Sequence, residues 1–207
     1  MISVFIVEDN PDIQLLLQTI VCRDDEYACV GVVATGTEAL RRIPELLPDV
    51  VLMDIGLPDL SGIDCVRKLK PLCPNVEFIM CTIYDEDETV FQSLEAGANS
   101  YILKKSNPEL LLMAIREVHE GGSPMSSDIA RKIVTRLQRN GQVRADYHIT
   151  PREVDVLTML SKGLTYAEVA DGLFISVKTL KKHIYDIYEK LHVDNKVEVP
   201  NKFFGKY

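Results

Sequence analysis

Residues 50–62 read VVLMDIGLPDLSG and combine an apolar run with an acid and a turn. The four apolar residues at 50–53 are typical of a strand buried on both faces, because a strand with one solvated face would alternate apolar and polar residues. The strand ends on a carboxylate, Asp54, and Gly56 and Pro58 then predict a turn. An acid at the carboxyl end of a buried parallel strand lies where the functional crevice of such a sheet opens.

Four further apolar runs flank this strand, at residues 2–8, 28–34, 76–82 and 100–104. Between the runs, apolar residues recur every three or four positions, as one face of a helix requires. This alternation predicts five βα units. We therefore expect residues 1–120 to form a doubly wound α/β domain, with a five-stranded parallel sheet of order 2-1-3-4-5 covered by helices on both faces.

The pattern changes after GGSP at residues 121–124. Residues 126–139 are basic with apolar positions at helical spacing, which predicts a linker helix within a connecting segment, 121–148. From 149 to 207 only helical patterns occur, and we expect a small all-α domain there. Its predicted helices begin at the capping boxes TPRE (150–153) and TYAE (165–168) and at Ser176, and a short fourth helix covers 195–199 before Pro200.

The two parts of the chain differ in charge. The net charge is -8, but residues 1–121 hold 9 Lys and Arg against 21 Asp and Glu, whereas residues 122–207 hold 14 against 10. The second part is therefore the one suited to a polyanion. No apolar run approaches the roughly 18–20 residues of a membrane span and no signal-type segment is apparent, so we expect a cytoplasmic protein without membrane contact. The five cysteines lack metal-ligand spacing and are expected to be buried, reduced thiols.

Five polar side chains fall at the carboxyl ends of predicted strands: Glu8 and Asp9 after the first, Asp54 after the third, Thr82 at the fourth and Lys104 at the fifth. The first and third strands are neighbours in the expected order, so three carboxylates converge and require a cation or a base. Mg²⁺ fits, because it prefers oxygen ligands and keeps water positions that a phosphoryl oxygen can take. With a hydroxyl and an ammonium beside it, the cluster predicts a site that forms and holds a phosphoryl group on Asp54.

The segment ISVKTLKKHIYDIYEKL, residues 175–191, predicts the helix that would contact the polyanion. One face carries an apolar stripe at Val177, Leu180, Ile184, Ile187 and Leu191, and the opposite face is basic. A lysine-rich face on an isolated helix would be a solvated surface. As the third helix of a capped helical unit, it is instead typical of a helix that enters the major groove of double-stranded DNA. The candidate DNA contacts are Lys178, Thr179, Lys181, Lys182 and Tyr185.

These motifs resemble those of a known family. DIGLPDLSG (54–62) and EAGANSYILK (95–104) are similar to the receiver domain of two-component response regulators, and SVKTLKKH followed by IYEKL is similar to the recognition helix of LuxR-type helix-turn-helix domains. Over nearly its whole length the chain resembles transcription factors of the NarL/FixJ class. The resemblance implies phosphorylation of Asp54 by a sensor histidine kinase, Mg²⁺ held by Glu8, Asp9, Asp54 and the carbonyl of Gly56, and a response of Thr82, Tyr101 and Lys104 to the phosphoryl group.

The resemblance also implies a DNA-binding regulator rather than an enzyme, acting as a homodimer on spaced half-sites. The last helix normally carries the dimer contact of such domains, and Pro200 interrupts it, so the linker helix or the receiver is the alternative interface. Tyr185 stands where the family often has a polar or basic residue, so the target sequence does not carry over. The acidic stretch YDEDE, residues 84–88, is interpreted as a solvated turn, with kinase contact as the alternative.

Two other functions stay open on the sequence alone. The receiver fold could serve only as a dimerisation scaffold in a phosphorylation-independent regulator or interaction module. A phosphohydrolase with Asp54 as nucleophile is disfavoured, because position 56 is Gly and offers no general acid two residues later. The division of charge adds a further hypothesis, that the acidic receiver shields the basic helix while Asp54 is unphosphorylated.

Overall fold

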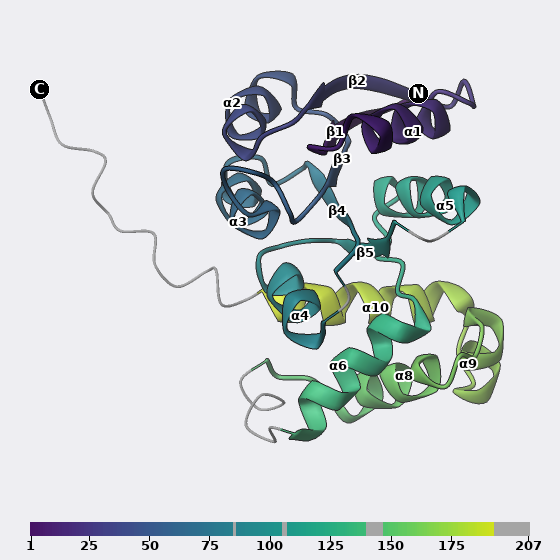
Figure 1. Cartoon of the computed structure of the whole chain (residues 1–207). Helices are drawn as coiled ribbons and strands as arrows, with labels where there is room; N and C mark the ends of the chain where they lie inside the picture. Colours follow the sequence, from purple (N-terminus) through teal and green to yellow (C-terminus); the bar gives the residue numbers. More distant parts are fainter. Residues whose placement is uncertain (85, 105–106, 140–146, 193–207) are drawn as a thin grey trace, which may run out of the picture.

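A computed structural model describes residues 1–84, 86–104, 107–139 and 147–192 (Figure 1). The expected helix at 195–199 and Pro200 lie outside these ranges. Within them, the first 119 residues form alternating strands and helices, and the remainder is helical. No helix among the described residues is both long enough and apolar enough to cross a membrane.

The sheet has the expected topology. Its strands are β1 (Ile2–Val7), β2 (Tyr27–Val33), β3 (Val50–Met53), β4 (Glu77–Thr82) and β5 (Ser100–Leu103). They pair in the order β2-β1-β3-β4-β5, and every pair is parallel. The predicted strand ends agree to within one residue, because continuous apolar runs bounded by polar residues leave little freedom in where a buried strand stops.

Helices cover both faces of the sheet. They are α1 (Pro11–Val21), α2 (Gly36–Leu46), α3 (Gly62–Leu72), α4 (Asp87–Glu95) and α5 (Pro108–His119). Successive strand residues point to opposite faces, so β1 sends Val4 and Ile6 into one buried cluster with α1 and α5, and Phe5 and Val7 into another with α2 and α3.

The C-terminal part consists of α6 (Ser127–Arg139), α8 (Pro151–Ser161), α9 (Tyr166–Gly172) and α10 (Val177–Leu191). Both predicted capping boxes are present, at Thr150 with Glu153 and at Thr165 with Glu168. A side-chain oxygen of Ser176 likewise accepts the N–H of Thr179 and begins α10. The three helices after the linker helix therefore begin where their caps predict.

The buried cluster on the α2 and α3 side of the sheet continues without interruption into these C-terminal helices. Helix α4 packs against both α6 and α10, so that α10 runs between the β5 side of the sheet and helices α6 and α8 (Figure 1). The rings of Phe91 and Tyr147 meet edge to face with their centroids 5.7 Å apart. The hydroxyl of Tyr188 donates to the carbonyl of Pro124 at 3.2 Å. The two parts thus share one core on the α4 side.

The cysteines depart from expectation at one position. Cys65, Cys73 and Cys81 are buried and Cys29 is partly buried, but Cys22 is exposed; all five are free thiols. Cys22 follows the last residue of α1, where the helix ends at the surface, and this position explains its exposure.

Candidate functional site

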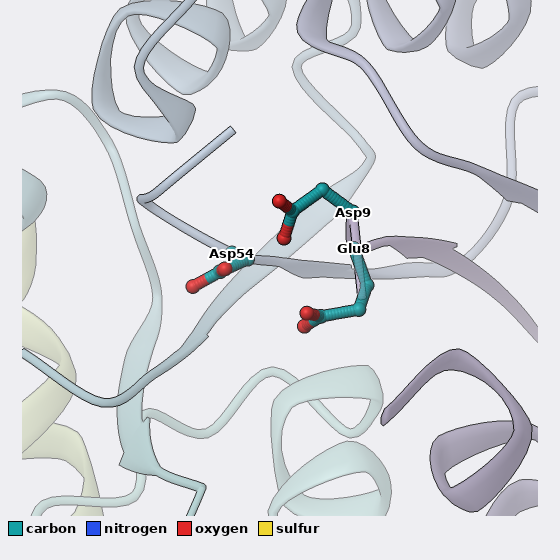
Figure 2. Close-up of side chains that lie close together, drawn as sticks. All are labelled: Glu8, Asp9 and Asp54. Atoms are coloured by element: carbon teal, nitrogen blue, oxygen red, sulfur yellow. The ribbon is translucent and has the colours of Figure 1, made fainter. Parts of the chain in front are cut away.

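Three carboxylates converge at the carboxyl edge of the sheet. β1 pairs with β3 so that Val7 lies opposite Met53, and the N–H of Asp54 donates to the carbonyl of Val7 at 2.9 Å. This register brings Asp54 beside Glu8 and Asp9, the two residues that follow β1 (Figure 2). One oxygen from each acid lies within 4.8 Å of the others. Glu8 and Asp54 are buried and Asp9 is exposed, so the cluster opens to solvent on the side of Asp9.

Lys104 supplies the base of this cluster. Its Nζ lies 2.6 Å from Oε2 of Glu8 and 2.9 Å from Oδ2 of Asp54. Burial would lower the pKa of Lys104, but the hydrogen bonds and charges of these two carboxylates outweigh burial and raise it. For Glu8, burial is the largest influence and raises the pKa, although Lys104 opposes it. The ammonium therefore compensates the acids only in part.

The remaining charge fits a divalent cation. Three carboxylates and one ammonium leave two negative charges when all are ionised. The donors are hard oxygens, and the exposed side at Asp9 leaves room for water ligands, which is the environment that Mg²⁺ prefers. Glu8, Asp9 and Asp54 could thus hold the metal. Gly56 lies two residues beyond Asp54 in the same loop, and the role of its carbonyl stays a prediction.

The loop after Asp54 is fixed at two positions that the sequence reasoning missed. A Cβ atom on Gly62 would overlap the carbonyl oxygen of Asp54, so only glycine permits this close approach. Asp59 accepts hydrogen bonds from the N–H groups of Gly36 and Thr37 at 2.8 and 2.9 Å and from the Thr37 hydroxyl. The Thr37 hydroxyl and these N–H groups lower the pKa of Asp59 to about 2. Both residues lie in the stretch GLPDLSG, residues 56–62, and the glycine at position 62 was the feature of the sequence that could have indicated a close backbone approach.

Thr82 and Tyr101 are linked through the backbone of Tyr84. Thr82 is fully buried at the end of β4, and its hydroxyl accepts a long hydrogen bond, 3.5 Å, from the N–H of Tyr84. Tyr101 is buried on β5, and its hydroxyl donates to the carbonyl of Tyr84 at 2.9 Å. Because the N–H of Lys104 also donates to the carbonyl of Thr82, the ends of β4 and β5 are held together. The structure therefore places all three predicted response residues around one corner of the sheet.

The acidic stretch that follows is only in part a solvated turn, because Asp87 and Glu88 form the first turn of α4 and make ion pairs. Asp87 pairs with Lys132 at 2.9 Å, and Glu88 pairs with Arg136, whose guanidinium also lies 5.0 Å from the ring centroid of Phe91. These partners lie on α6, 45 and 48 residues away in the chain, so no local pattern could reveal them. Asp87 and Glu88 are about half exposed, as an acidic surface predicts, but they lie in a helix and have partners, which the prediction of a turn did not include. They connect α4, which lies just beyond Thr82, to the linker helix.

The predicted recognition helix presents most of its basic face to solvent. Lys178, Thr179, Lys182 and Tyr185 are exposed on α10. Lys181 is partly buried and pairs with Glu117 of α5 at 3.1 Å, so one candidate DNA contact is engaged by the receiver.

One member of the apolar stripe of α10 was placed wrongly. Leu180, Ile184, Ile187 and Leu191 are buried as expected, but Val177 is 40% exposed. The reason is its position at the first residue of the helix, at the margin of the packed unit, where the 3.6-residue pattern continues although the core does not.

Comparison with known proteins now decides the family. Residues 4–116 match the family model described as response regulator receiver domain, and residues 148–201 match that of bacterial regulatory proteins, luxR family. The chain belongs to the LuxR-family response regulators. The transcriptional regulatory protein YhcZ of Bacillus subtilis, itself uncharacterized, is 36% identical over 198 residues, which are 95% of this regulator and 92% of YhcZ. The response regulator VraR of Staphylococcus aureus is 29% identical over 95% of this regulator and 93% of VraR.

Solved structures agree with this assignment. A LuxR-family two-component response regulator from Aurantimonas is 30% identical with a TM-score of 0.61, and the match covers 65% of this regulator and 96% of that chain. ChrA, the response regulator of a heme-sensing two-component system, is 29% identical with a TM-score of 0.55 over 94% of this regulator and 92% of ChrA. The predicted family, fold class and combination of a receiver with a LuxR-type DNA-binding domain are confirmed.

Proposed function

We propose that this regulator is a phosphorylation-controlled, sequence-specific DNA-binding protein whose phosphoacceptor is Asp54. The observation that carries the proposal is the convergence of a buried carboxylate, two further acids and a lysine at one corner of the sheet. A sensor histidine kinase would donate the phosphoryl group: an oxygen of Asp54 attacks phosphorus, a P–O bond forms, and the P–N bond to the kinase histidine breaks. The reaction needs no general acid in the regulator, which accords with a glycine at position 56.

Each neighbouring residue would have a distinct part in this reaction. Glu8, Asp9, Asp54 and the carbonyl of Gly56 would hold Mg²⁺, whose charge offsets the repulsion between the acids and the incoming phosphoryl oxygens. Lys104 now contacts Oδ2 of Asp54 at 2.9 Å, and its ammonium would transfer that contact to a phosphoryl oxygen. The N–H of Ile55 donates to Oδ1 of Asp54 at 2.8 Å and orients the carboxylate for attack.

The signal would pass from the phosphoryl group to α4. The group adds about 1.5 to 2 negative charges and strong acceptor oxygens, which attract the hydroxyl of Thr82. That movement would compete with the long Tyr84-to-Thr82 hydrogen bond and so disturb the contact between Tyr84 and Tyr101. A population shift of one to two orders of magnitude requires about 1.4 to 2.8 kcal/mol, which one or two charge-assisted hydrogen bonds supply.

DNA binding would respond because the receiver lies against part of the recognition helix. Lys181 is paired with Glu117, and a cleft of about 1210 Å³ between α5 and α6 reaches both residues. Burial raises the pKa of Tyr185, and after it the negative charges of Glu189 and of Glu77 in the receiver act in the same direction. The acidic receiver would thus hold the part of this face around Lys181 until phosphorylation loosens α4 and α5. The freed protein would bind spaced half-sites in the cytoplasm as a homodimer.

The phosphoacceptor is tested by incubating the full chain with Mg²⁺ and a small labelled phosphodonor. The wild type should incorporate label, and Asp54→Asn should not. Asp64→Asn is the matched control, because Asp64 is a partly exposed acid on α3 paired with Arg67, and this variant should leave labelling unchanged. A chelator should abolish incorporation. Equal labelling of Asp54→Asn, or none of the wild type, would favour the alternative in which the receiver is only a dimerisation scaffold.

A further inference from the structure

An apolar side chain is exposed at the leading end of the recognition helix. Val177 is the first residue of α10 and is 40% exposed, whereas the other residues of its stripe are exposed by 1% or less. Its neighbours Lys178 and Thr179 are exposed as well. Within the described residues, Val177 therefore belongs to the surface that α10 offers rather than to the core beneath it.

The family of the domain and the position of Val177 in α10 favour DNA as the partner of this exposed side chain. The chain has a LuxR-type DNA-binding domain, and the N-terminal residues of a recognition helix are those that contact base edges in the major groove. Most groups at those edges are hydrogen-bond donors and acceptors, which a valine would desolvate without pairing. The exception is the C5 methyl group of thymine, the one apolar group that the four bases present there.

We propose that Val177 is a specificity-determining residue that contacts the C5 methyl group of a thymine in each half-site. The inference rests on the proposed sequence-specific DNA binding and adds the chemical group that one residue recognises. A thymine without its methyl group, which is uracil, keeps every hydrogen bond of the base and loses only this contact. Removing one methyl group from an apolar contact should weaken binding about fourfold.

The test begins with selection of bound sequences from a random DNA pool by the full-length protein, in the presence of Mg²⁺ and phosphodonor. Each thymine of the enriched site is then replaced singly by uracil, and the dissociation constants of wild type, Val177→Ala and Val177→Thr are measured. The wild type should lose about fourfold at one thymine per half-site. Val177→Ala should bind the thymine site more weakly and should no longer distinguish thymine from uracil at that position. Val177→Thr keeps one methyl group and should therefore retain only part of this difference.

Two controls separate this contact from other effects. Val30→Ala removes the same atoms from a valine that is 38% exposed on β2, and it should keep the full sensitivity to uracil. Thr179→Ser removes the other methyl group near the start of α10 and leaves a hydroxyl, and it too should keep the sensitivity. Val177→Thr keeps the β-branched shape, so folding losses seen only with alanine do not affect the comparison.

The outcomes are distinct. If the site is enriched but the wild type binds uracil as well as thymine at every position, or if Val177→Ala retains the wild-type sensitivity, the contact does not exist. If the sensitivity disappears with Thr179→Ser instead, the methyl group belongs to another residue and the proposal is wrong. If no sequence is enriched under any condition, sequence-specific binding itself fails, and the inference fails with it.

Discussion

At the scale of single residues, the position of Asp54 depends on the absence of a Cβ atom at Gly62. The strand end was predictable because a buried apolar run stopped at an acid. The need for glycine at position 62 was not predictable, because it arises from a close approach to the carbonyl of Asp54, and the sequence does not reveal the path of the loop between them. The same is true of Asp59, whose hydrogen bonds reach 22 and 23 residues back along the chain.

Gly62→Ala should therefore lower the stability of the fold and displace the backbone of Asp54. The new Cβ must push the carbonyl of Asp54 aside, and we expect a loss of about 3 kcal/mol in the free energy of unfolding, from overpacking against backbone. Denaturant unfolding measures it. Gly172→Ala is the control, because its Cβ would meet the flexible end of Met159 and should cost far less. Equal stability of Gly62→Ala and wild type would contradict the close approach.

A substitution at Phe174 should instead raise the free energy of unfolding. This residue lies between α9 and α10 with φ of +55°, a left-handed conformation that L-residues with a Cβ disfavour, and it is 94% exposed. Phe174→Asn should raise the free energy of unfolding by about 1 kcal/mol, a rise of about 2–4 °C in Tm, because asparagine tolerates this region. Phe174→Ala removes the ring but keeps the strain and should gain less. If alanine gains as much as asparagine, relief of the backbone is not the cause.

At the scale of helices and strands, local sequence patterns predicted where the elements begin and end, but not which elements contact each other. Capping boxes and continuous apolar runs are local, and the helices and strands began within a residue or so of where they indicated. The ion pairs of Asp87 and Glu88 could not be predicted because their partners lie on α6. Val177 was misread for a related reason, since periodicity gives the direction of a side chain but not where the core ends.

Glu153 joins α8 to α10 and should make the helical part sensitive to acid. Its carboxylate is buried and lies 2.6 Å from Nζ of Lys190. Burial would raise its pKa, but Lys190 and the N–H of Thr150 outweigh burial and hold the pKa below the ordinary 4.5. The stabilisation is therefore present above about pH 4.5 and is lost as the pH falls through the lowered pKa.

Glu153→Gln should cost about 1–2 kcal/mol in the free energy of unfolding near pH 7, since it keeps the capping box and loses the charged hydrogen bond. The difference in the free energy of unfolding between wild type and Glu153→Gln should become smaller below pH 4.5. Unfolding by denaturant at several pH values measures both. Glu168→Gln is the control, because it occupies the same capping position on α9 with no described lysine partner, and its loss should be smaller. A gap that stays constant with pH would argue against the ion pair.

At the scale of the whole molecule, the sequence predicted the opposite charges of the two parts but not where they meet. Among the described residues the opposite charges meet where Asp87 and Glu88 pair with α6 and where Glu117 pairs with Lys181 of α10. Nothing in the helix patterns pairs these residues, because the contacts depend on how the helical part docks. The shared core on the α4 side and the cleft on the α5 side follow from the same docking.

Glu117→Gln should raise the affinity of the unphosphorylated full-length protein for its site at low salt. The pair is partly exposed, so we expect a gain of up to about fivefold, which shrinks as salt screens the charges. Fluorescence anisotropy at two salt concentrations measures it. Glu120→Gln changes the net charge equally at the exposed end of α5 and should gain less. Identical gains in the two variants would show only a general effect of charge.

The most direct test of the account is the affinity of the full-length protein for its selected DNA site, with Mg²⁺ present, before and after addition of phosphodonor. The wild type should bind at least about tenfold more tightly after phosphorylation, the shift that about 1.4 kcal/mol produces, and Asp54→Asn should not change. Tightening that is the same in Asp54→Asn, or a wild type whose labelled form binds no better than its unlabelled form, would contradict the claim that Asp54 controls DNA binding.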